Sequence, residues 1–65
     1  MQIYVNDEVH HPADGRLPTL LSELDADPER VVVVINGAVV PREQRASHVL
    51  HDQDRVDVFT FAGGG

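Results

Sequence analysis

The residues most suggestive of chemistry stand at the C terminus, where the chain ends in Gly63-Gly64-Gly65. Glycine is the most costly residue to order, so a folded domain gains no stability from ending in three of them. Without a Cβ, such an end can enter a narrow channel, and it leaves the terminal carboxylate unhindered. An α-carboxyl has an ordinary pKa of about 3.3–3.7 and is ionised at neutral pH. The carboxylate of Gly65 can therefore attack the α-phosphate of ATP, giving an acyl-adenylate that a sulfur or nitrogen nucleophile displaces.

Possible metal ligands occur as three pairs: His10 with His11, His48 with His51, and Asp52 with Asp54. Adjacent residues of a strand point to opposite faces, so the first pair cannot chelate one ion. The second pair has no third ligand nearby. The aspartates lack the further oxygen ligands and the glycine of a calcium loop, so a solvated turn is the better interpretation. We expect no metal site.

The charged stretch at Arg42, Glu43 and Arg45 has two interpretations of equal weight. Ion pairs worth about 0–1 kcal/mol each would let the loop fix its own geometry. Alternatively, the stretch contacts a partner, and Arg42 is the residue we include in a predicted interface.

Composition limits the class of protein. Sixty-five residues allow one small domain, and 42% hydrophobic with 25% charged residues is typical of a folded one. The net charge of −6 argues against binding to nucleic acid and favours basic protein partners. No apolar run is long enough to span a bilayer, so we expect no membrane association and a cytoplasmic location. With no cysteine and no lysine, the chain has neither a thiol nor a side-chain amine for covalent catalysis.

The residue pattern predicts one helix and several strands. Leu17, Leu20, Leu21 and Leu24 follow the i, i+3, i+4, i+7 spacing of an amphipathic helix, which Asp27-Pro28 would end. Asn36-Gly37 is a strong signal for a type I′ hairpin. Residues 42–54 are polar and loop-like, with Val49-Leu50 as an anchor into the core. The predicted strands are residues 2–5, 8–11, 31–35, 39–40 and 56–61.

A hairpin, a crossover helix and three further strands make an α+β domain in which a mixed sheet packs against one main helix. This order is that of the β-grasp, the ubiquitin-like architecture. We expect a single domain over residues 1–65, with residues 62–65 as a flexible tail.

Side chains alternate along the last predicted strand, so its two faces have different roles. Val56 and Val58 suit the core, which would place Phe59 and Phe61 on the open face beside the tail. Exposed apolar patches usually mark interaction sites, so we predict that both phenylalanines dock on partner proteins. The opposite register, with the phenylalanines in the core, is the alternative.

The chain also resembles a known family, the ThiS sulfur carrier proteins of thiamine biosynthesis. The residues that carry the resemblance are Met1-Gln2-Ile3, Asn6-Asp7, Ile35-Asn36, Val40-Pro41-Arg42-Glu43-Gln44, His48, Asp52-Gln53-Asp54, Phe59 and Gly64-Gly65. The resemblance covers the whole chain. One departure is Gln53, where the family often has glycine.

The resemblance implies a protein co-substrate rather than an enzyme. A ThiF-like adenylyltransferase would use ATP and Mg²⁺ to adenylate Gly65, with Gly63 and Gly64 giving access to its active site. Sulfur from a cysteine desulfurase would then convert the adenylate to a thiocarboxylate. A ThiG-like thiazole synthase would take that sulfur for the thiazole ring of thiamine. The carrier itself would bind no cofactor stably.

Three alternatives remain open from the sequence. The small subunit of molybdopterin synthase is also a sulfur carrier with a Gly-Gly end, but it is usually longer. A ubiquitin-like modifier would begin with the same adenylation and end as an amide on another protein. A β-grasp regulatory module would not need the Gly-Gly end.

Overall fold

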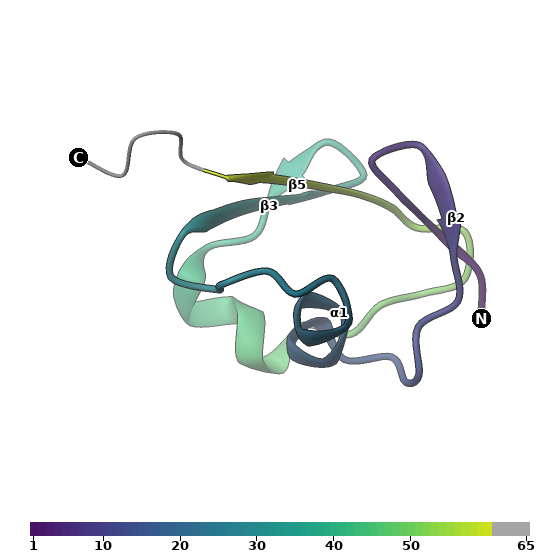
Figure 1. Cartoon of the computed structure of the whole chain (residues 1–65), viewed down its shortest axis with the longest axis horizontal. Helices are drawn as coiled ribbons and strands as arrows, with labels where there is room; N and C mark the ends of the chain where they lie inside the picture. Colours follow the sequence, from purple (N-terminus) through teal and green to yellow (C-terminus); the bar gives the residue numbers. More distant parts are fainter. Residues whose placement is uncertain (61–65) are drawn as a thin grey trace.

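The computed structural model of the chain describes residues 1–60, which form a sheet and a helical layer (Figure 1). The elements, in order, are β1 (Ile3–Val5), β2 (Glu8–His10), α1 (Leu17–Glu23), β3 (Val31–Ile35), β4 (Ala38–Val39), the 3₁₀ helix η1 (Arg42–Ser47) and β5 (Arg55–Thr60). The predicted flexible tail, residues 62–65, lies outside the described residues.

The strands form one mixed sheet in the order β2-β1-β5-β3-β4. The β1–β5 pairing is parallel, and the other three pairings are antiparallel. A parallel pair needs a crossover connection, and α1 lies on the connection between the two hairpins, against one face of the sheet (Figure 1). The predicted β-grasp architecture is confirmed.

Both hairpins turn through residues with positive φ. Asn36 and Gly37 have φ angles of 52° and 83°, as the predicted type I′ turn requires. Asn6 and Asp7, the turn between β1 and β2, have φ angles of 48° and 69°. Asparagine and aspartate tolerate this left-handed region better than other non-glycine residues.

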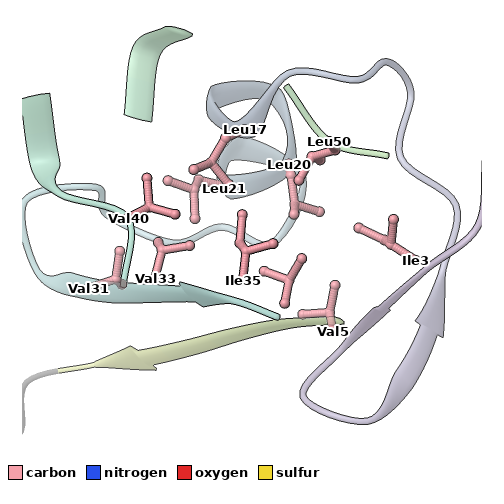
Figure 2. Packing of buried hydrophobic residues seen from close by; sticks show 11 residues of the cluster. Ile3, Val5, Leu17, Leu20, Leu21, Val31, Val33, Ile35, Val40 and Leu50 are labelled. Carbon is pink, nitrogen blue, oxygen red and sulfur yellow. The ribbon is translucent and has the colours of Figure 1, made fainter. Parts of the chain in front are cut away.

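The core lies between the sheet and α1 (Figure 2). Three of the four leucines that predicted the helix are fully buried, and Leu24 packs partly buried against them. From the sheet, β1, β3 and β5 contribute their inward residues. The buried cluster is Ile3, Val5, Leu17, Leu20, Leu21, Val31, Val33, Ile35, Val40, Leu50 and Val56.

Helix α1 ends earlier than Asp27-Pro28, where the sequence placed its end. The helix stops at Glu23, and Asp25 takes the left-handed conformation with a φ of 57°. The N–H of Asp25 then donates to Ser22 O, and that of Ala26 donates to Leu21 O. This hydrogen-bond pair is the Schellman motif, here with aspartate in the position that glycine usually takes.

The segment after β4 is more regular than the predicted loop. Residues Arg42–Ser47 form η1, which begins after Pro41 at its fixed φ of −59°. Leu50 is buried as predicted, whereas Val49 is 58% exposed, so its assignment to the core was wrong. The two side chains of this extended pair point in opposite directions, and only one can reach the core.

Four strands have boundaries that differ by one residue from the predicted ones. β1 begins at Ile3 rather than at residue 2, β2 ends at His10 rather than at residue 11, β4 is Ala38–Val39 rather than 39–40, and β5 begins at Arg55 rather than at residue 56. Differences of this size are common at element ends. The predicted last residue of β5, Phe61, lies outside the described residues.

The carboxylate of Glu23 links the end of α1 to β2 and to the loop that follows β2. His10 Nε2, on β2, lies 3.1 Å from Glu23 Oε1, and the N–H of Ala13 donates to Glu23 Oε2 at 2.9 Å. The hydrogen bond with His10, followed by that from Ala13, holds the pKa of Glu23 below its ordinary value. The folded state therefore favours the ionised carboxylate.

We expect the stabilising effect of these two Glu23 interactions to depend on pH. Because the folded-state pKa of Glu23 is lowered, its contribution is present above the ordinary value of 4.5 and is lost as the pH falls through the lower, folded value. Urea unfolding should show Glu23→Gln to be less stable than wild type at about pH 6, with the difference shrinking towards about pH 3. The control is Glu8→Gln, an exposed carboxylate on β2. A difference for Glu23→Gln that stays constant over this range would contradict the assignment.

Candidate functional site

The face of the sheet that α1 leaves uncovered carries apolar side chains from all five strands, with the charged residues Arg55 and Asp57 of β5 among them. Directly paired residues share a face, and the pairs here are Tyr4↔Val9, Val32↔Phe59 and Val34↔Val39. Phe59 is 55% exposed and Val39 is 63% exposed. We call these six residues the open-face patch. A patch that crosses all five strands is typical of a protein-binding surface.

The faces of β5 follow the predicted register. Val56 is 1% exposed, and Val58 packs partly buried against the core. Phe59 points to the open face, so its predicted placement is confirmed and the opposite register is wrong, while its docking on partners stays a prediction. Phe61, the second predicted docking residue, lies outside the described residues, as do the predicted tail residues Gly63, Gly64 and Gly65.

Tyr4 joins the open-face patch to polar groups at the start of β5. The guanidinium of Arg55 lies 5.9 Å from the centroid of the Tyr4 ring, within the range of a cation–π contact. The hydroxyl of Tyr4 accepts from Gln2 Nε2 at 3.2 Å and donates to Gln53 Oε1 at 3.3 Å. These contacts hold the ring in place at one side of the patch.

The turn before β5 is held by side-chain hydrogen bonds and is not a fully solvated loop. Asp54 is 8% exposed, which corrects the sequence-based interpretation for this residue. Its Oδ1 accepts from Asn36 Nδ2 at 2.9 Å, and its Oδ2 accepts from the N–H of His51 at 2.8 Å. Asn36 Oδ1 in turn accepts from the N–H of Arg55 at 3.0 Å. The turn thereby ties the β3–β4 hairpin to the start of β5.

The two other residues of this turn explain the Asp-Gln-Asp pattern. Asp52 Oδ1 accepts from the N–H of Gln2 at 2.7 Å. This bond, assisted by Gln53, holds the pKa of Asp52 below its ordinary value. Gln53 has a φ of 71°, the left-handed region that favours glycine. This turn therefore requires a residue with positive φ between its two aspartates.

Arg45 fixes local geometry, as one of the two interpretations predicted, but through carbonyl groups rather than ion pairs. Its Nη1 donates to Pro28 O at 2.6 Å and its Nη2 to Val31 O at 2.7 Å. Val31 pairs with Thr60, the last described residue of β5. Arg45 therefore supports the sheet next to the point where the tail begins, a role that sequence reasoning missed because the contacts span 14 and 17 residues.

Arg42 lies apart from the open-face patch, on η1. Its Nε is 3.4 Å from Glu29 Oε2, and its Nη2 donates to Glu29 O at 3.4 Å. Both side chains are well exposed, so this ion pair is worth about 0–1 kcal/mol and can be exchanged for another partner. The predicted partner contact of Arg42 stays a prediction.

The histidines and acids do not assemble into a metal centre within residues 1–60, where no group of three or more potential ligands occurs. His10 is engaged with Glu23. In the same residues, no helix is both long and apolar enough to cross a membrane.

Comparison with known proteins agrees with this geometry. The model of the ThiS family matches residues 1–65. The sulfur carrier protein ThiS of Escherichia coli K12 is 38% identical, over the full length of both chains. The crystal structure of the thiamine biosynthesis protein ThiS from Geobacter metallireducens is 33% identical and superposes with a TM-score of 0.82, again covering 100% of both chains.

A second kind of relative is a much larger protein. The thiazole synthase of Magnetococcus marinus is 41% identical over the whole of this chain, which spans only 20% of that protein. The thiazole synthase of Paramagnetospirillum magneticum shows the same coverage at 32% identity. A segment similar to this chain is therefore part of both polypeptides.

The turn before β5 gives a prediction for stability. Asp54→Ala leaves two donors without their acceptor, Asn36 Nδ2 and the N–H of His51, and should lower the free energy of unfolding by about 1–3 kcal/mol per unpaired group. Urea denaturation measures this loss. Glu43→Ala removes an exposed carboxylate on η1 and should change stability by less than about 0.5 kcal/mol. Equal losses in the two variants would show that the turn is not held by Asp54.

Proposed function

The chain belongs to the ThiS family and is a sulfur carrier of thiamine biosynthesis, and we propose that the sulfur travels on the carboxyl group of Gly65. The observation that carries the proposal is the Gly63-Gly64-Gly65 end of a chain that has no cysteine to hold sulfur itself. A carrier of this kind is a recycled co-substrate of other enzymes.

The chemistry proceeds in two stages. On the partner enzyme, Mg²⁺ binds the phosphates of ATP. The Gly65 carboxylate attacks the α-phosphorus, and pyrophosphate leaves. A protein persulfide, charged by a cysteine desulfurase, then attacks the acyl carbon, and AMP leaves. The product is an acyl disulfide, and a second thiol attacks its outer sulfur to release the thiocarboxylate and a disulfide. The carrier supplies only the carboxylate, and ATP and Mg²⁺ stay with the partner.

Two enzymes have to bind the same carrier in this scheme. A ThiF-like adenylyltransferase forms the acyl-adenylate, and a thiazole synthase accepts the sulfur. The similarity of this chain to a segment of two thiazole synthases supports the second partner, because carrier and enzyme then share one polypeptide. The need for ATP and reducing thiols supports a cytoplasmic location.

We assign partner docking to the open-face patch, with Phe59 as its most prominent member. Phe59 is the last but one described residue of β5, so a partner that covers it binds three residues before the predicted tail in sequence. Five residues, 61–65, reach at most about 18 Å when extended, which is enough to enter a buried active site. The net charge of −6 favours partners with a basic surface, and Arg42 on η1 would contact an acidic group of a partner at a second place, apart from the patch.

The terminal residue should be indispensable. A variant lacking Gly65, or carrying Gly64→Phe, should form no thiocarboxylate in the presence of the adenylyltransferase, ATP, Mg²⁺ and a persulfide donor. Mass spectrometry of wild type should show a gain of about 16 Da, for an oxygen replaced by sulfur. Ala62→Gly is a control that should keep this gain. Conjugates with other proteins in place of the gain would identify a modifier instead.

Phe59→Ala should separate docking from folding. Because the ring is more than half exposed, its removal should change the free energy of unfolding by less than about 1 kcal/mol, against about 3–5 kcal/mol for a core phenylalanine. Binding to the adenylyltransferase and to thiazole synthase should weaken by at least about tenfold, measured by calorimetry. Val49→Ala is the matched control, an exposed apolar residue outside the patch. Unchanged affinity for both partners would remove Phe59 from the interface.

A further inference from the structure

We propose that Asn6 is a positioning residue for the activation of Gly65, because its side-chain amide holds β5 just before the tail begins. The proposal rests on the proposed function and adds to it a residue that touches neither ATP nor the reacting carboxylate. Asn6 lies in the β1–β2 turn, 52 residues from its contact in sequence.

The amide of Asn6 pairs with β5 in both directions. Asn6 Oδ1 accepts from the N–H of Val58 at 3.0 Å, and Asn6 Nδ2 donates to Val58 O at 3.4 Å. The backbone N–H of Asn6 also donates to Val56 O at 2.9 Å. The side chain therefore continues the parallel β1–β5 ladder by one step after β1 itself has ended at Val5.

In the described part of the chain, no other strand pairs with β5 on the β1 side after the pairing with β1 ends. The β1–β5 pairing covers only Tyr4↔Arg55 and Val5↔Val56. Beyond Val58, the neighbour of β5 is β3 alone, through Phe59 and Thr60. Because the Phe59 side chain is exposed, it adds little packing that would hold the strand down. The Asn6 amide thus makes the last lateral hydrogen bonds of β5 on the β1 side among residues 1–60.

The position of this contact matters for the reaction. Residues 59–65 link the open-face patch to the reacting carboxylate, so the direction in which β5 ends sets where Gly65 arrives in the partner's active site. Misplacing a reacting group by about 1 Å can cost up to about 100-fold in rate. If the end of β5 frays, the carboxylate reaches the reactive geometry in a smaller fraction of bound complexes, while the rest of the patch still docks. The expected loss is in kcat more than in KM.

Asparagine meets two requirements at this position. The turn needs a residue that tolerates a φ of 48°, and Val58 needs one acceptor and one donor from the same side chain. Glycine meets the first requirement and removes the amide, so Asn6→Gly isolates the contact. Asn6→Asp keeps an acceptor for the Val58 N–H but places a carboxylate oxygen against Val58 O.

Asn36 provides a matched control. It holds the equivalent place in the second I′ turn, with a φ of 52°, and its Oδ1 accepts from the N–H of Arg55 at 3.0 Å. Its Nδ2 donates to Asp54. Asn36→Gly therefore removes the same kind of amide contact at the other end of β5, far along the strand from the tail.

The test is ATP–pyrophosphate exchange by the adenylyltransferase, with each variant titrated as the carrier substrate. We expect Asn6→Gly to lower kcat by about tenfold with KM changed by less than about threefold, and Asn6→Asp to fall between it and wild type. Asn36→Gly should keep kcat within about twofold, even if its midpoint of unfolding falls by as much as that of Asn6→Gly. Equal kcat losses in the Asn6 and Asn36 glycine variants, or an effect on KM alone, would overturn the proposal.

Amide hydrogen exchange gives a second readout that does not depend on the reaction. In Asn6→Gly the Val58 N–H should lose protection while those of β3 keep theirs, and in Asn36→Gly the loss should fall on Arg55. Unchanged Val58 protection would overturn the anchor even if exchange activity falls. If wild type supports no ATP–pyrophosphate exchange while Val58 is protected, the proposed function fails and the positioning role fails with it.

Discussion

The structure depends on the placement of β5, which is the last strand in sequence and the middle strand of the sheet. A strand in that position must pair on both sides, parallel with β1 and antiparallel with β3. The parallel pairing requires the crossover that α1 provides, and α1 in turn buries the leucines that make the core. The tail of the chain therefore continues directly from the middle strand of the domain.

This placement divides the sheet into two faces with different roles. Along β3, Val31, Val33 and Ile35 are buried against α1, whereas Val32 and Val34 belong to the open face. A chain of 65 residues buries only about 60% of its unfolded surface, and in residues 1–60 it has a single α-helix with which to cover a sheet. Exposed apolar side chains on the open face lower the solubility of such a domain, and a partner that covers them shields them from water.

The sequence predicted well whatever depends on local periodicity. The leucine spacing located α1, the alternation along residues 56–59 placed Phe59 outside, and Asn36-Gly37 located a hairpin. The glycine end and the residues of the ThiS resemblance gave the function, which needs no three-dimensional information. These signals are carried by residues close together in the chain, so a single sequence is enough to detect them.

Several of the side-chain contacts that sequence reasoning missed join distant segments. Asp54 is buried because Asn36 and the start of β5 pack against it. The Asp-Gln-Asp sequence does not indicate that an Asp54 oxygen accepts from a donor 18 residues away. η1 follows Pro41, but Arg45 ties it to the segment that enters β3. Only tertiary structure decides such pairs.

These distant polar contacts share one consequence for a carrier whose chemistry takes place on its own C terminus. The apolar core sets the stability of the domain, but it leaves the two ends of β5 without strand neighbours on one side or the other. Asp54 and Asn36 secure the first end, and Asn6 secures the second. A strand held at both ends by side-chain amides and a carboxylate keeps its direction without a longer sheet. Because the reacting group follows only five residues beyond Thr60, it is the hold of Asn6 on this second end, rather than that of Asn36 on the first, that bears on the carboxylate in the proposed scheme.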